Sequence, residues 1–294
     1  MRTTIMFILG IACTLGACSD DVVDVSAQQA GGQAQNGKAD DVEQGQRPSL
    51  DSRYLFTIES ELVLGQTDSD KTTEVTAAVG GIAQVQQTDN TVLLTLTPCS
   101  IELPKVEGRE LEIGEDAVGA IPAIDVTGTF AHGETGYLLH LDPSAFIAGA
   151  ELNDVLTDTL PTDKRDDRLV DVDQDNRAGI TLKILGHSIY GSLRLVFSTS
   201  LADVKGSQEW MGAADLAMDF YVVDDSVPFV DVQDKLDEAL AELTVDEQDN
   251  RFRLIPMAVE TELSCIGVAE QLSNALPEPG VSDSEGTSAE ESGD

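Results

Sequence analysis

The chain is short of the residue types that build most active sites. Its 294 residues include three histidines, four cysteines and one tryptophan, and aromatic residues make up 4% of the total. No cysteine or histidine pair has the spacing of a zinc site. The Gly-x-Ser-x-Gly nucleophile motif and the glycine-rich loops that bind phosphates or dinucleotides are also missing. These shortages predict a protein that is not an enzyme.

Basic residues are scarce as well. The chain has 17 lysines and arginines against 54 aspartates and glutamates, which gives a net charge of -37. Such a surface repels nucleic acid and anionic lipid head groups, so no nucleic-acid partner is expected. An acidic surface keeps an exported protein soluble and attracts cations, but it identifies no partner.

One long apolar run is present, and it lies at the N-terminus. It extends from Ile5 to Leu15, follows Arg2 and is too short to span a bilayer. This pattern predicts an export signal over residues 1–17 that is removed from the mature protein. The alternative, a buried helix of the folded domain, is disfavoured by the basic flank and by the polar sequence that follows the run.

The end of this run, Leu15-Gly16-Ala17-Cys18, resembles the bacterial lipobox. The resemblance implies that Cys18 carries acyl chains such as palmitate and becomes the mature N-terminus. Two or more acyl chains make membrane anchoring stable. Ser19 follows the cysteine where an aspartate would favour the inner membrane. The expected location is therefore the cell envelope, in the outer membrane rather than the inner one.

Composition divides the mature chain into three parts. Residues 18–50 are the lipidated cysteine and a segment rich in Gln, Gly, Ala and Asp, which predicts a disordered tether. Residues 273–294 include six acids and no base from Pro277 onward, which predicts a disordered acidic tail. Residues 51–272 form the single β-rich domain between them.

The four cysteines are expected to differ in their chemistry. Cys13 leaves with the signal and Cys18 carries lipid, so Cys99 and Cys265 are the two thiols left in an oxidising compartment. An even pair in that setting predicts a disulfide. A metal pair or a reactive thiol is the alternative, although neither cysteine has a histidine or another cysteine close in sequence.

Alternation of apolar and polar residues dominates the domain. Gly80-Gly81 inside one alternating segment predicts a bulge or sharp bend. Short connections predict an all-β fold: an antiparallel meander that closes into a barrel or barrel-like sandwich, lipocalin-like in outline. One or two short helices are expected, at 231–244 and more weakly at 144–156. The predicted strands lie at 54–64, 73–87, 91–98, 124–131, 137–141, 179–185, 189–198, 216–223 and 252–259.

The clearest local motif is a series of aspartates at alternate positions. Such a series can fold around Ca²⁺, and the four candidate ligands are Asp171, Asp173, Asp175 and the carbonyl of Arg177. An EF-hand is excluded, because Asn176 replaces the required glycine and Leu182 the bidentate glutamate. The alternative is an acidic turn whose side chains bond to their own backbone before the strand that starts at Gly179.

The run from Leu160 to Thr181 resembles a pattern of the type LPTDxxDxxVxDxDxDGxPGVT, found in uncharacterised secreted lipoproteins of myxobacteria and related bacteria. Asn176 and Ala178 stand where that pattern has glycine and proline. The resemblance covers about residues 54 to 268. It includes Cys99 before a Leu-Pro pair and Asn250-Arg251-Phe252 before Cys265. The resemblance implies the β architecture and the disulfide, and it does not indicate a reaction.

Together these features predict a lipid-anchored, monomeric, non-enzymatic module that binds a partner or serves a structural role at the surface, with calcium as its one candidate cofactor. Its expected partners are the membrane, reached through the N-terminal lipid, and another protein. The alternative is a carrier that holds a small apolar ligand in a barrel cavity. A hydrolase with an unrecognised carboxylate pair is disfavoured, because no nucleophile lies beside a base in the sequence.

Overall fold

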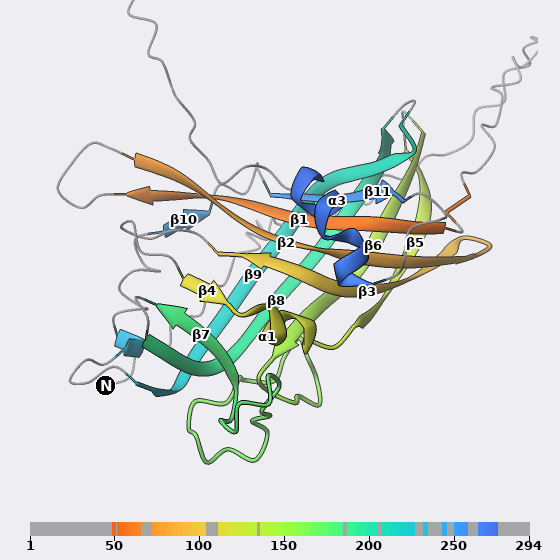
Figure 1. Cartoon of the computed structure of the whole chain (residues 1–294). Helices are drawn as coiled ribbons and strands as arrows, with labels where there is room; N and C mark the ends of the chain where they lie inside the picture. Colours follow the sequence, from red (N-terminus) through yellow and green to blue (C-terminus); the bar gives the residue numbers. More distant parts are fainter. Residues whose placement is uncertain are drawn as a thin grey trace, which may run out of the picture.

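The computed structural model shows a β-barrel with short additional elements at one end and on its outer wall (Figure 1). The residues that it describes are 49–50, 52–65, 72–103, 111–133, 136–184, 187–204, 207–226, 232–234, 243–245, 250–257 and 264–275. The predicted signal peptide, the lipidation site at Cys18 and nearly all of the predicted tether lie outside these residues.

Eight antiparallel strands form a closed ring. Going round the wall, the order is β8-β6-β5-β3-β2-β1-β11-β9, and β9 pairs back with β8 along most of its length. The predicted all-β antiparallel barrel is therefore confirmed, and closure excludes two separate sheets. The strands are β1 (Ser52–Gly65), β2 (Thr72–Thr88), β3 (Thr91–Glu102), β5 (Ile124–Gly133), β6 (Gly136–Ala148), β8 (His187–Val204), β9 (Glu209–Asp225) and β11 (Arg251–Pro256).

Short elements in the described part of the chain lie outside the ring. β7 (Ile180–Ile184) pairs with the start of β8, and β4 (Leu111–Ile113) pairs with β7. β10 (Leu243–Val245) extends the far end of β1. Helix α1 (Glu115–Gly119) lies at the β4–β7 end, and α3 (Cys265–Ala275) lies outside the wall formed by β2 and β3 (Figure 1). None of the described helical segments has the length and apolar content needed to cross a membrane.

Alternation along the strands directs apolar side chains to both faces of the barrel wall. In β1, Phe56 and Ile58 are buried in the main core, whereas Leu55 packs outward with Ile82 beneath α3. Four phenylalanines contact one another in a cycle across the barrel, with ring centroids 5.6 to 6.2 Å apart. The middle of the barrel is thus filled with side chains. The four rings are those of Phe56, Phe146, Phe197 and Phe252.

The predicted irregularity at Gly80-Gly81 is confirmed. The register between β2 and β3 shifts between these two residues. Gly81 faces the core opposite Phe56, where a Cβ atom would collide with the Thr97 carbonyl and lie 2.6 Å from the phenylalanine ring. Glycine is needed here because it leaves room for one of the four central rings.

The predicted helix at 144–156 is wrong. Ser144–Ala148 completes β6, and the residues after it form turns. Pro143, the residue just before the predicted helix, lies in a shift of register between Leu141 and Ser144. A bulge tolerates proline inside a strand because the missing N–H would not have paired there.

The other predicted helix, at 231–244, is only partly described. Residues 232–234 are helical, and 235–242 lie outside the described residues. Leu243 belongs instead to strand β10. The sequence also gave no indication of α3, which continues to Ala275, beyond the predicted domain end at 272.

Candidate functional site

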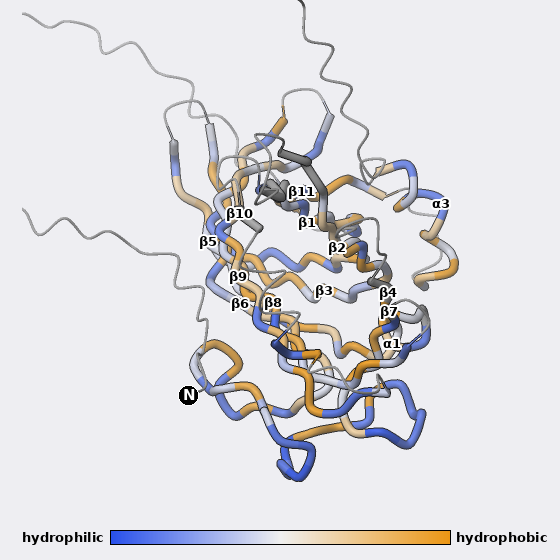
Figure 2. The backbone as a smooth tube through the Cα atoms, turned by 90° about the vertical axis from the view of Figure 1, so that its left-hand side faces the viewer, coloured by the Kyte–Doolittle hydropathy of each residue, from blue (hydrophilic) through white to orange (hydrophobic). Residues whose placement is uncertain are grey.

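The segment between β6 and β7 is folded mainly by aspartate side chains. It forms the hydrophilic loops below the barrel in Figure 2. Asp154 accepts hydrogen bonds from the amides of Leu156 and Thr157, and Asp158 accepts from those of Asn153 and Asp154. Such side-chain turns order a polar segment without helices or strands.

An arginine fastens this segment to the barrel wall. Arg194 of β8 forms an ion pair with Asp219 of β9. Its Nη1 also donates hydrogen bonds to the carbonyl oxygens of Asp158, at 2.7 Å, and Val155, at 3.3 Å. The loop is therefore positioned by a charged group that belongs to the rigid barrel.

A second arginine, Arg168, closes the loop on itself. Its guanidinium and its backbone amide both bond to Asp166, and its Nη1 donates to the Thr159 carbonyl. The side-chain bonds first, and then the amide bond, lower the pKa of Asp166 to about 2. The carboxylate is therefore stabilised in its charged form by the folded loop.

We expect this pair to make the loop sensitive to acid. A carboxyl group with a lowered pKa stabilises the fold above its unfolded pKa of about 4, and this stabilisation is lost as pH falls through about 2. At pH 5, Asp166→Asn should lower the free energy of unfolding by less than about 1 kcal/mol, because the pair is partly exposed. Melting temperatures of both proteins should converge between pH 4 and pH 2. A constant difference would contradict this assignment.

Three of the predicted calcium ligands lie together. One carboxylate oxygen from each of Asp171, Asp173 and Asp175 lies within 4.8 Å of the other two. Two oxygens bound to the same Ca²⁺ at about 2.3 to 2.6 Å can be at most about 5 Å apart. The cluster is thus compact enough for these three oxygens to contact one ion.

The backbone bends sharply to bring these carboxylates together. Gln174 and Asn176 adopt left-handed conformations, with φ of 58° and 66°. Asp171 accepts hydrogen bonds from the amides of Asp175, at 3.1 Å, and Asn176, at 2.9 Å. The alternative prediction of side-chain turns therefore describes this loop too. The two interpretations are compatible, because each carboxylate oxygen has two lone pairs.

One oxygen of Asp173 differs from the others. Asp173 Oδ2 accepts a hydrogen bond from the Thr181 amide at 3.0 Å. Asp173 Oδ1 is buried and has no hydrogen-bond partner in the described part of the chain. A buried charged oxygen without a partner is costly, and a bound cation would satisfy it.

Arg177 turns its charge away from the three aspartates. Its Nη1 lies 3.4 Å from Asp224, and its guanidinium stacks over the Tyr190 ring at 5.4 Å. The guanidinium of Arg177 is thus engaged by Asp224 and Tyr190. The cluster described above contains carboxylate oxygens only. The backbone carbonyl of Arg177 therefore stays a prediction as the fourth ligand.

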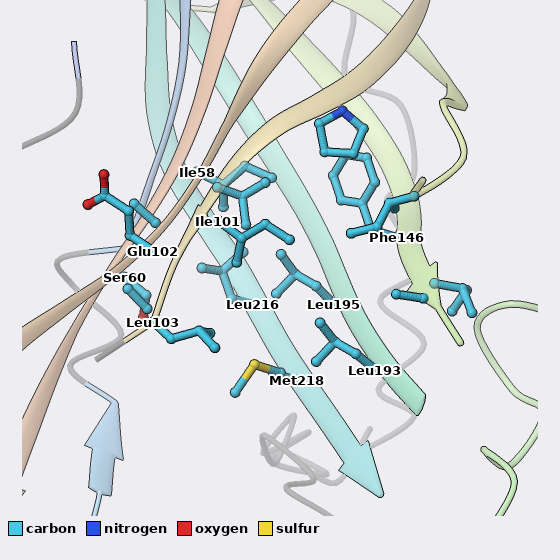
Figure 3. Close-up of a pocket in the computed structure, with 17 residues that line it drawn as sticks. Ile58, Ser60, Ile101, Glu102, Leu103, Phe146, Leu193, Leu195, Leu216 and Met218 are labelled. Carbon is cyan, nitrogen blue, oxygen red and sulfur yellow. The ribbon is translucent and has the colours of Figure 1, made fainter. Parts of the chain in front are cut away.

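A second feature is an apolar pocket inside the barrel, beside the phenylalanine cycle (Figure 3). Its volume is about 60 Å³. Sites for whole drug-sized ligands occupy about 300 to 1,000 Å³, and a cavity that holds benzene about 150 Å³. The described residues thus leave room for part of a ligand. The lining includes Ile58, Val79, Ile101, Phe146, Leu195 and Met218.

A Ser–His contact on the outer wall was not predicted from the sequence. His140 Nδ1 and Ser200 Oγ are 2.6 Å apart, at directly paired positions of β6 and β8. Both groups are exposed, and neither belongs to the lining of the apolar pocket.

Cys99 and Cys265 form the predicted disulfide, with Cα atoms 5.1 Å apart. Cys265 is the first residue of α3, so the bridge joins β3 to a helix.

Comparison of the chain with protein-family models, curated proteins and solved structures finds no match in any of the three.

Proposed function

We propose that the protein is a lipid-anchored, non-enzymatic binding module of the cell envelope, and that it binds Ca²⁺ through Asp171, Asp173 and Asp175. The observation that carries the calcium proposal is the buried, unpartnered Oδ1 of Asp173 inside a compact group of carboxylates. Oxygen-only donor sets of this kind suit calcium rather than softer metals.

The anchoring part of the proposal depends on the N-terminal sequence. The lipobox-like run at Cys18 and the polar segment after it support a protein held at the membrane surface by lipid. The resemblance to secreted myxobacterial lipoproteins points the same way. In this proposal the tether separates the barrel from the membrane, which leaves the barrel surface accessible to a partner protein.

Calcium would have a structural effect on that surface. The cluster lies where the loop returns to the barrel, since Asp171 pairs with Gly179 just before β7 begins. An ion here would cross-link residues 171–175 and stiffen the loop. The proposed result is a recognition surface that is ordered only when calcium is present.

Thermal unfolding of the mature chain tests the calcium proposal. With free Ca²⁺ at 100 times the dissociation constant, binding to the native state contributes about 2.7 kcal/mol. For a domain of this size that raises the melting temperature by about 5 to 10 °C. Asp173→Asn should abolish the shift, and the chelator EGTA should reverse it.

Asp167→Asn is the matched control, because Asp167 is an exposed acid of the same segment and lies outside the cluster. It should retain the full calcium response. Equal melting temperatures with calcium and with chelator would overturn the proposal. So would an equal loss of the response in both variants, since general screening of the acidic surface would then explain the shift.

A second candidate function is that of a carrier for the apolar end of a small molecule. It is supported by the pocket in the barrel, whose accessible lining is apolar. The phenylalanine cycle blocks the middle of the barrel, so in this proposal a ligand enters only part of the way.

A further inference from the structure

We propose that the apolar pocket binds the end of a single aliphatic chain that carries a cationic head group, with Glu102 as the counter-charge beside it. This inference rests on the carrier function proposed above and is independent of calcium binding.

The shape of the pocket favours a chain over a ring. Phe146 belongs to both the pocket lining and the central phenylalanine cycle, so the rings close the inner end. About 60 Å³ is too small for an aromatic ring but admits the narrow end of a methylene chain. Met218 is a partly exposed lining residue, so the pocket reaches the solvent.

The lining itself favours hydrocarbon. All of the lining surface that a ligand would touch is apolar. A polar group inserted here would lose its hydrogen bonds to water without replacement, whereas each buried methylene contributes about 0.8 kcal/mol. The polar part of the ligand must therefore stay at the mouth.

Glu102 determines which head group fits. Among the described residues that line the pocket, it is the one with a charged side chain. In Figure 3 its carboxylate points away from the apolar side chains. Burial raises the pKa of Glu102, and no residue in the described part of the chain forms an ion pair with it. A cationic group would stabilise this carboxylate.

The net charge of the protein disfavours an anionic head group. With a net charge of -37, the protein repels carboxylate, sulfate and phosphate head groups before they reach the pocket. Fatty acids and anionic lipids are thus poor ligands. Neutral and cationic head groups remain, and of these the Glu102 carboxylate favours an alkyl ammonium compound.

Calorimetric titration of the full mature chain with three decyl compounds below their micellar concentrations tests this inference. The head groups are trimethylammonium, maltoside and sulfate. We expect saturable binding to one site, with the cationic compound at least tenfold tighter than the anionic one. Glu102→Gln should weaken binding of the ammonium compound about fivefold and leave the maltoside unchanged.

Two further variants separate pocket binding from attraction to the acidic surface. Ala77→Leu fills the pocket and should weaken binding of the ammonium compound at least tenfold. Ala213→Leu, a matched change at an exposed position of β9, should have no effect. Binding that Ala77→Leu leaves intact would overturn both the carrier function and the ligand class. Binding that Ala77→Leu abolishes but that is equal for all three head groups would overturn the ligand class alone.

Discussion

Replacing Cys99 and Cys265 together with serine is expected to lower the free energy of unfolding by on the order of 5 kcal/mol. The bridge closes a loop with a sequence separation of 166, so its loss returns a large conformational entropy to the unfolded chain. A domain with an ordinary stability of about 5 to 15 kcal/mol would lose much of it.

The local effect should appear first in α3. Its inner face packs Val268 and Leu272 onto the small core that contains Leu55 and Ile82. The disulfide holds the N-terminal end of the helix, at Cys265. At the C-terminal end, Arg253 Nη1 donates a hydrogen bond to the Ala275 carbonyl. Without the bridge the helix is held to one face of the barrel by non-covalent contacts, so it should detach before the barrel unfolds.

Urea unfolding gives the global effect, and hydrogen exchange of residues 265–275 gives the local one. Wild-type protein treated with a dithiol reductant is the control, and it should match the double variant. An unchanged unfolding midpoint together with full amide protection in α3 would contradict the expectation, because the helix would then be held without the bridge.

The second large effect is expected from Phe197→Ala, which should cost about 3 to 5 kcal/mol. Phe197 is completely buried and contacts the rings of Phe146 and Phe252 at 5.6 and 5.7 Å. Its removal opens a cavity in the middle of the barrel, because strands fixed by hydrogen bonds on both sides cannot move inward to fill it.

Chemical denaturation measures this cost. Phe197→Leu retains most of the volume and should lose clearly less, which keeps a measurable transition if the alanine variant is too unstable. Phe220→Ala is the matched control, since Phe220 is only half-buried and packs at the margin of the core. A loss for Phe197→Ala no larger than that for Phe220→Ala would mean that the phenylalanine cycle is not the centre of the fold.

This cycle also bears on function. A barrel that is filled across its middle cannot hold a ligand along its whole axis. Both proposed sites accordingly lie away from the centre: the aspartate cluster on the loop before β7, and the apolar pocket beside Phe146. The central barrel acts as a rigid frame that positions them.

Sequence reasoning succeeded where the determining interactions are local. Period-two alternation identified the barrel strands, and Gly80-Gly81 identified the register shift. Both features can be recognised because a half-buried strand and a bulge restrict the residue types at adjacent positions. It failed at Pro143, where proline at a strand bulge resembles proline at a helix start.

Helix α3 was not predicted from the sequence, for a related reason. It has no acid in its first turn and no base in its last turn, and only Val268 and Leu272 are buried. Two apolar residues four apart are too few to reveal helical periodicity in sequence. The helix is stabilised instead by the disulfide and by the outer face of the barrel.

By itself the sequence determined that this is an acidic chain of alternating strands with three aspartates spaced to converge, and it predicted that Cys99 pairs with Cys265. Each of these features is set by residues a few positions apart or by composition. Only the tertiary structure decided that β9 closes the ring against β8 and that four phenylalanines from β1, β6, β8 and β11 fill it. It also decided that one Asp173 oxygen is buried without a hydrogen-bond partner among the residues that the structure describes. These outcomes depend on pairing between residues far apart in the chain, which no local pattern specifies.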